Sequence, residues 1–194
     1  NRVSGYGWVK QGGGVNVTQS RVTLRNCLVY GNYAESEGGG LWMEGINWSA
    51  QAVDVQNCTV TGNQAGDKGG GVYILTNFVY FTVSNSVVFN NAATNAYPDA
   101  FSHGNQIGYC CLGDTNGVPN AETDGNMAAD PRFLDAAGGN YRLRSDSPCI
   151  NAGTNQSWMA TGVDLDGQPR LFKTLVDLGA YERRYFEGTV FNIH

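Results

Sequence analysis

The feature of this sequence that most restricts its fold is an internal repeat. A glycine triplet followed by three mostly apolar residues occurs three times, at 12–17, 38–43 and 69–74. A second phrase follows each copy and ends in the pattern Asn-Cys/Ser-x-Val-x-x-Asn, at 26–32, 57–63 and 85–91. A unit that recurs about every 30 residues predicts a stack of supersecondary elements, because no single unit can bury its own apolar face.

The spacing of apolar residues inside each unit identifies the elements as strands. In the second phrase they occupy every other position: Val22 and Leu24, Val53 and Val55, Phe81 and Val83. Alternation of this kind places side chains on the two faces of a strand, and Gly, Asn and Asp supply the turns. No segment has a convincing 3.6-residue stripe. The sequence therefore predicts an all-β fold, a parallel β-helix of about four coils whose equivalent residues lie about 4.8 Å apart.

Two columns of asparagine are expected at the turns between strands. The first contains Asn26, Asn57 and Asn85, and the second contains Asn32, Asn63 and Asn91. Stacked carboxamides can hydrogen-bond to one another and to the turn backbone, and Asn tolerates the left-handed conformation. Because these residues recur at turn positions, we interpret them as structural ladders rather than as catalytic or sugar-binding groups.

A column of aromatic residues is the candidate ligand-binding surface. Trp42 and Tyr73 share an outward position, opposite the inward face of their strands, and Trp48 lies in the loop just beyond. An exposed row of rings could stack on sugar rings or on a partner protein. The alternative is that the loops at 44–51 and 75–79 fold back over the rings and bury them.

Composition and charge exclude several classes of function. The net charge is −5, the isoelectric point is near 4.9, and no cluster of Lys and Arg could neutralise a row of phosphates, which argues against nucleic acid. No apolar run is long enough to span a bilayer. No repeat column contains two carboxylates, and His103 has no recognisable acid partner, so we expect no catalytic residues.

The cysteines are expected to be packing residues. Cys27, Cys58, Ser86 and Cys110 share one inward column, where small and soft side chains pack well. Buried thiols are the favoured interpretation, and a disulfide between Cys111 and Cys149 is the alternative. Zinc binding is not expected, because the cysteine spacing does not fit it.

After a shortened fourth coil at 104–112 the sequence changes character. We divide the chain into β-helix coils at 1–112, a last coil and irregular C-terminal cap of the same domain at 113–184, and a strand-like tail at 185–194. Asp164 and Asp166 resemble half of a calcium loop. The other interpretation is that Asp164, Asp166 or Asp177 stabilises the cap by pairing with Arg170.

Five short motifs in the C-terminal part carry a family resemblance. They are Asp-Pro-x-Phe from 130, Tyr-x-Leu from 141, Ser-Pro-x-Ile-x-x-Gly from 147, Asp-x-Asp-Gly-x-x-Arg from 164, and Val-Asp-x-Gly-Ala-Tyr-Glu from 176. In this order they resemble the C-terminal signature of bacterial right-handed parallel β-helix proteins of the choice-of-anchor Q type, within the pectate-lyase-like superfamily. The glycine-rich repeats are similar to those of polymorphic outer-membrane adhesins.

This resemblance covers about residues 12–182 and implies a right-handed β-helix and a secreted or cell-surface location. It implies no activity, because most such proteins have no assigned one. The chain departs from the pattern at Asn151, where the family usually has Asp, and it extends past the usual end beyond Glu182.

The expected function is that of a non-enzymatic extracellular module: a surface adhesin, a fibre subunit or a matrix scaffold. The alternative is a β-helix protein that binds or cleaves polysaccharide. Expected partners are a polysaccharide, a surface protein or a second copy of the chain. For self-association we expect the tail, with Val190, Phe191 and Ile193, to pair with the open strand edges of a neighbouring copy, forming a head-to-tail filament. The alternative is that upstream coils have been removed and that the tail leads to an anchor.

Overall fold

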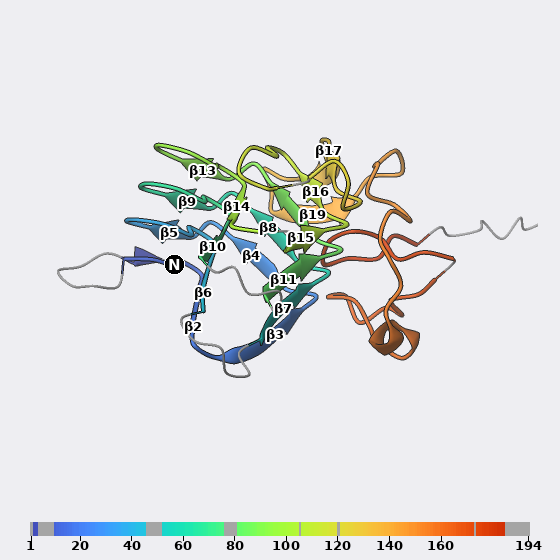
Figure 1. Cartoon of the computed structure of the whole chain (residues 1–194). Coiled ribbons are helices and arrows are strands. Elements are labelled where there is room, and N and C mark those ends of the chain that lie inside the picture. Colours follow the sequence, from blue (N-terminus) through green and yellow to red (C-terminus); the bar gives the residue numbers. More distant parts are fainter. Residues whose placement is uncertain are drawn as a thin grey trace, which may run out of the picture.

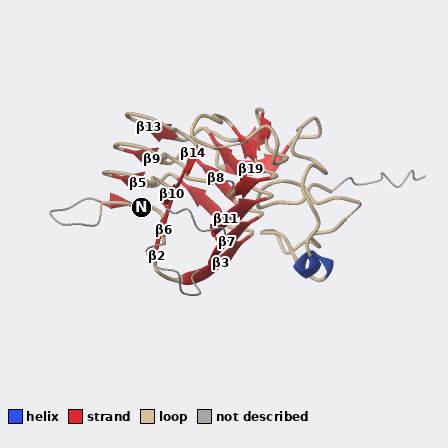
Figure 2. Ribbon diagram, viewed as in Figure 1, coloured by secondary structure: helices blue, strands red, loops and turns tan. Residues whose placement is uncertain are grey.

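The computed structural model shows a parallel β-solenoid of about three turns, all-β except for one short 3₁₀ helix (Figures 1 and 2). It describes residues 2–3, 10–45, 52–75, 81–104, 106–119, 121–172 and 174–184. Trp48, Val190, Phe191 and Ile193 lie outside these residues. In the described part of the chain, no helix has the length and apolar character needed to cross a membrane.

Four stacks of parallel strands form the walls of the solenoid. The first stack contains β1 (Arg2–Val3), β5 (Tyr33–Ala34), β9 (Gln64–Ala65) and β13 (Ala92–Ala93). The second contains β2 (Val15–Thr18), β6 (Leu41–Glu44), β10 (Val72–Leu75) and β14 (Ala100–Ser102). The third contains β3 (Arg21–Arg25), β7 (Ala52–Gln56), β11 (Phe81–Ser84) and β15 (Ile107–Gly108). The fourth contains β4 (Leu28–Tyr30), β8 (Thr59–Thr61), β12 (Val87–Phe89), β16 (Cys111–Leu112) and β17 (Met127–Ala128).

The strand register follows the repeat. Leu41 pairs with Val15 on one side and with Val72 on the other, and Val55 pairs in the same way with Leu24 and Val83. Ile107 continues the column of Val83, as the shortened fourth coil predicts. The expectation of about four coils is corrected to about three turns, because the last level contributes only the short strands β14, β15 and β16.

The interior of the solenoid is a column of aliphatic residues with one aromatic ring. Val53, Val55, Phe81 and Val83 are fully buried, and they pack in one cluster with Leu41, Met43, Val72 and Ile74. Each buried apolar side chain contributes roughly 1.5–3 kcal/mol to folding. Alternation along the strands therefore explains which face of each strand is buried in the interior of the solenoid.

The glycine triplets are explained by close approach between coils. A Cβ atom on Gly39 would lie 2.4 Å from the carbonyl oxygens of both Gln64 and Gly70. A Cβ on Gly71 would lie 2.7 Å from Nδ2 of Asn91 in the same coil. At the last level this third glycine is replaced by Asp99, which precedes β14 directly in the chain.

The chain beyond the last coil performs two separate tasks. Val118 and Ala121, in the loop that follows β16, are buried in the main core cluster, and Gly117 O accepts a hydrogen bond from Ser102 N in β14. This loop closes the C-terminal end of the solenoid. It lies within the range 113–184, where a last coil and cap are expected from the sequence.

Residues 130–184, here called the side segment, instead lie along the flank of the strand stacks (orange to red in Figure 1). The side segment contains an antiparallel pair, β18 (Phe133–Asp135) with β19 (Asn140–Leu143), and the 3₁₀ helix η1 (Ser157–Ala160). Its hydrogen bonds reach the first three coils, at Asn26, Asn57 and Asn85. The segment therefore braces the solenoid from the side, and the expected cap is divided between this brace and the preceding loop.

Candidate functional site

The predicted aromatic column exists, but its rings are buried. Trp42 pairs in register with Asn16 and Tyr73, and Tyr73 pairs with Phe101 in β14. The rings of Tyr73 and Phe101 stack with their centroids 4.8 Å apart. Trp42 is 7% exposed and Tyr73 is 8% exposed. Of the two interpretations of this column, burial of the rings is the one that agrees with these exposures.

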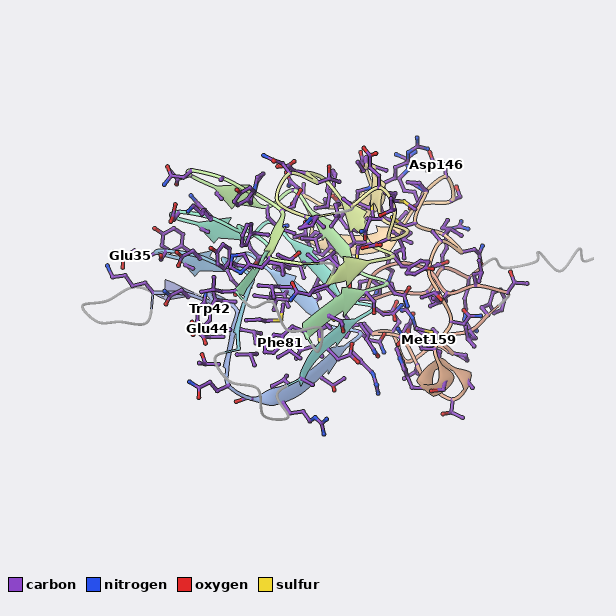
Figure 3. All side chains as sticks on the ribbon, viewed as in Figure 1. Glu35, Trp42, Glu44, Phe81, Asp146 and Met159 are labelled. Atoms are coloured by element: carbon purple, nitrogen blue, oxygen red, sulfur yellow. The ribbon has the colours of Figure 1, made fainter. Side chains whose placement is uncertain are left out.

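Trp42 and Tyr73 line a small hollow on the β2–β6–β10 wall, here called the aromatic hollow. Its volume is about 370 Å³, and its polar lining comes from Gln11, Asn16, Thr18, Glu37 and Glu44. Figure 3 shows Trp42 and Glu44 close together on this wall. Burial, followed by the negative charges of Glu37 and Asp67, raises the pKa of Tyr73, so its hydroxyl group stays protonated.

The chemistry of the aromatic hollow suits a ligand rich in hydroxyl groups. Asn16 Oδ1 accepts a hydrogen bond from Thr18 Oγ1 at 3.1 Å, and Asn16 Nδ2 donates to Gln11 O at 3.1 Å. The carboxylates of Glu37 and Glu44 add acceptors beside the side chains of Trp42 and Tyr73. Acceptors and donors next to an apolar surface are the elements of a site that orients a small polar ligand.

The second asparagine column is a continuous ladder of buried amides. Asn32 Nδ2 donates to Asn63 Oδ1 at 2.9 Å, and Asn63 Nδ2 donates to Asn91 Oδ1 at 3.0 Å. Asn63 Oδ1 also accepts a hydrogen bond from the backbone N–H of Asn32, and Asn91 Oδ1 accepts one from the backbone N–H of Asn63. Asn91 donates in turn to Oδ1 of Asp99, whose pKa is raised by burial. The carboxylate of Asp99 therefore accepts the last hydrogen bonds of the ladder, at the level where the repeat has no further asparagine.

The first asparagine column serves a different purpose. Asn26, Asn57 and Asn85 adopt left-handed backbone with φ of 51°, 49° and 49°. Their Nδ2 atoms donate to the side segment: to Val163 O at 2.6 Å, to Asp177 O at 3.2 Å and to Thr154 O at 2.8 Å. Asn85 Oδ1 also accepts from Thr154 N at 2.8 Å. These amides therefore hold the side segment instead of one another.

Asp164 and Asp166 stabilise the side segment. Asp164 accepts hydrogen bonds from the backbone N–H groups of Asp166, Gln168 and Glu182. Asp166 forms a two-point ion pair with Arg142, at 2.6 and 2.5 Å. Within the described ranges, no group of three or more His, Cys, Asp or Glu residues is placed to hold a metal ion.

Arg170 lies at the centre of a buried polar cluster in the side segment. It is fully buried, its Nη2 donates to the carbonyl oxygens of Asp177 and Gly179, and its Nε lies 3.8 Å from Glu182 Oε2. Burial, with the negative charge of Asp177, raises the pKa of Glu182 to about 8. The pairing of Arg170 with an acid was predicted, but its nearest carboxylate is Glu182 and not one of the three aspartates.

All five cysteines are free thiols. Cys58 and Cys110 are buried in the solenoid, whereas Cys27 is half-buried at the first coil. A hydrogen bond from Cys58 lowers the pKa of Cys27 to about 6. Cys111 and Cys149, considered as a disulfide from the sequence, form a hydrogen-bonded thiol pair that raises the pKa of Cys111.

Sequence reasoning missed Phe101, Glu37 and Glu44 as neighbours of the aromatic column. Phe101 occupies the position of Trp42 and Tyr73 at the last level, but the glycine triplet before it is replaced by Tyr97-Pro98-Asp99. The alternation of Ala100, Phe101 and Ser102 was the available signal. Searches of protein-family models, curated proteins and solved structures found no match for this chain.

Proposed function

We propose that this chain is a non-enzymatic structural and adhesive module that acts outside the cell, as a surface adhesin, a fibre subunit or a matrix scaffold. The observation that carries the proposal is the bracing of three successive coils by one side segment. Coils of a parallel solenoid contact only their neighbours along the axis. A brace that crosses several coils therefore gives a stiff unit suited to bearing load.

The extracellular location and the membership of the choice-of-anchor Q type rest on the five C-terminal motifs. Three residues of those motifs, Asp164, Asp177 and Glu182, surround the buried guanidinium group of Arg170. The same residues accept hydrogen bonds from backbone N–H groups of the side segment and so fix its internal turns. A requirement to keep this brace would explain why the motifs occur together and in this order.

Single-molecule pulling along the chain tests the structural role. We expect the parent to unfold in one high-force event that includes both the coils and the side segment. Asn57→Gly and Asn85→Gly remove side-chain bonds to the brace while keeping the left-handed turn available, so they should lower the unfolding force. Separate low-force steps for each coil in the parent would contradict the proposal.

A second candidate function is carbohydrate binding at the aromatic hollow, favoured by its carboxylate and amide lining beside two aromatic residues. Because Trp42 and Tyr73 are buried, the informative variants are at the rim: Asn16→Ala and Glu44→Ala, with Thr23→Ala on β3 as the matched control. Glycan-array signals that are lost in the rim variants and kept in the control support binding. Release of new chain ends from a bound polysaccharide would instead indicate a lyase or a hydrolase.

Head-to-tail self-association remains part of the proposal. Among the described strands, β2, β3 and β4 each stand at the end of their sheet, and such edges can accept a further strand. Deletion of residues 185–194 should abolish concentration-dependent assembly measured by light scattering. A parent that stays monomeric at high concentration, or assembly that is unchanged by the deletion, would refute this part.

A further inference from the structure

The side segment contains a second, larger pocket on its own surface. Its volume is about 910 Å³, and its lining residues all come from 134–184. Four arginines line it: Arg142, Arg144, Arg183 and Arg184. They are four of the twelve Lys and Arg residues of a chain whose net charge is −5. This arginine pocket is therefore a local concentration of positive charge on an acidic protein.

The two acids in the lining do not neutralise the arginine pocket. Both carboxylate oxygens of Asp166 accept hydrogen bonds from Arg142 in the two-point ion pair. Glu182 is buried and faces Arg170, Asp177 and Asp164, and this environment raises its pKa to about 8. Glu182 is therefore mostly protonated at neutral pH. Neither of these two acids therefore pairs with Arg144 or Arg184.

Two of these arginines can offer donors to a ligand. The side chain of Arg144 is 57% exposed, and its Nε lies 3.3 Å from Oδ1 of Asp146 at the surface. Such an exposed pair is weak and easily exchanged for another carboxylate. Arg184 lies over the ring of Phe172 at 5.3 Å, and its Nε is buried without a hydrogen-bond partner. An unpartnered donor next to the pocket gains from an acceptor that comes within hydrogen-bond distance of it.

The remainder of the lining indicates what else the ligand carries. Leu134 is 53% exposed, and with Leu143 it gives the pocket an apolar wall on the β18–β19 pair. Tyr181 also lines the pocket, but the guanidinium group of Arg142 covers its ring at 4.7 Å. The ring face that Arg142 covers is closed to a sugar, whereas leucine side chains and arginine forks suit a peptide with apolar and acidic residues.

We propose that the arginine pocket binds an acidic segment of a partner protein, with its carboxylates on Arg144 and Arg184 and an apolar side chain against Leu134. This site is separate from the aromatic hollow, and the inference stands whether or not that hollow binds carbohydrate.

The binding test uses a fluorescently labelled synthetic peptide of alternating glutamate and leucine, with a glutamine–leucine peptide as its uncharged match. Anisotropy titrations should show binding of the acidic peptide only, and its affinity should fall as salt is raised. Arg144→Gln and Arg184→Gln should each weaken binding about tenfold, whereas Arg21→Gln, an exposed arginine on β3, should leave it unchanged.

Several results would overturn the proposal. They are equal binding of the two peptides, no binding of either, or an equal loss in the Arg21→Gln control. Tighter binding of a uronic-acid oligosaccharide of matched charge would reassign the pocket to acidic polysaccharide. If Arg184→Gln lowers the melting temperature, the test depends on the peptide affinity of Arg144→Gln alone. The exposed side chain of Arg144 contributes little to stability, so a loss of affinity there reports on binding.

The acid in the pocket provides an independent readout. Affinity for the acidic peptide should increase as the pH falls from about 9 to about 7, because Glu182 becomes protonated in this range. Glu182→Gln should remove this pH dependence. An unchanged pH profile in the variant would contradict the role given to Glu182 in the charge balance of the pocket.

Discussion

Asparagine performs two distinct tasks in this chain, and its surroundings decide which. In the column of Asn32, Asn63 and Asn91 the amides are buried beside one another, and each satisfies the next. In the column of Asn26, Asn57 and Asn85 they face the side segment and bond to its backbone. The same residue type at two turn positions thus stabilises contacts between coils in one case and the attachment of the brace in the other.

Removing the middle amide of the ladder should be costly. Asn63→Ala leaves the N–H groups of Asn32 without their buried acceptor and removes the donor to Asn91 Oδ1 and Val29 O. We expect a loss of roughly 2–4 kcal/mol in the free energy of unfolding, measured by chemical denaturation. Asn95→Ala, which removes an exposed amide bond to Asp67, is the control and should cost less than about 0.5 kcal/mol. Equal losses would show that the ladder does not stabilise the fold.

Glu182 should make stability depend on pH. Its pKa rises from 4.5 to about 8 on folding, so between these values the folded chain holds a proton that the unfolded chain has lost. Stability is therefore highest below about pH 4.5 on this account, and it declines as the pH rises through about 8. The decline is at most about 5 kcal/mol, since each pKa unit corresponds to about 1.4 kcal/mol.

Denaturation curves between pH 5 and pH 9 test this dependence. Glu182→Gln mimics the protonated acid and should flatten the decline, whereas the exposed Glu122→Gln should leave it unchanged. Asp177, whose pKa is also raised by burial, contributes in the same direction and should leave a smaller residual slope. A parent that becomes more stable as the pH rises through this window would contradict the assignment.

At the scale of elements, the strands could be predicted closely and the side segment could not. Alternation and a three-fold repeat determine both the face and the register of β2, β6 and β10, because a shift by one residue would turn every apolar side chain outward. The side segment has no such period. Its placement depends on individual contacts between distant residues, such as Asn57 with Asp177, which no local pattern reveals.

The burial of Trp42 and Tyr73 illustrates a related limit. Sequence alternation correctly places them on the face opposite Leu41 and Val72, but it cannot tell whether an outward face is open or covered. Phe101 stacks on Tyr73 at the last level of the repeat. This level is hard to recognise in the sequence, because other residues replace the glycine triplet before Phe101. Likewise, a pocket lined by arginines from 142 to 184 arises only from the way the side segment folds on itself.

The attachment of the side segment should be separable from the strands by one turn residue. Asn85→Gly keeps the left-handed backbone available but removes both side-chain bonds to Thr154. Hydrogen exchange should become faster at the Thr154 amide and its neighbours, while the amides of β7 and β11 stay protected. Faster exchange throughout both strands would mean that this asparagine stabilises the coils themselves.

At the scale of the whole molecule, the solenoid and its brace form one structure. The side segment covers the first asparagine column, Gly179 N donates to Asn85 O, and Ala180 N donates to Thr59 Oγ1 in β8. Leu178 and Cys149 share a second core cluster with Val87 and Cys111 of the fourth strand stack. Because apolar and polar contacts join the two parts along several coils, we expect neither part to unfold without the other.

The most direct test of this central claim follows two tryptophans in one denaturation experiment. Trp42 reports on β6 of the solenoid, and Trp158 reports on η1 of the side segment. With the other tryptophans replaced by phenylalanine, single-tryptophan variants carrying either reporter should show the same transition midpoint and the same slope, and both should match the transition seen by circular dichroism. A Trp158 transition at clearly lower denaturant than that of Trp42 would show that the side segment is a loosely attached appendage, and the account of a braced solenoid would be wrong.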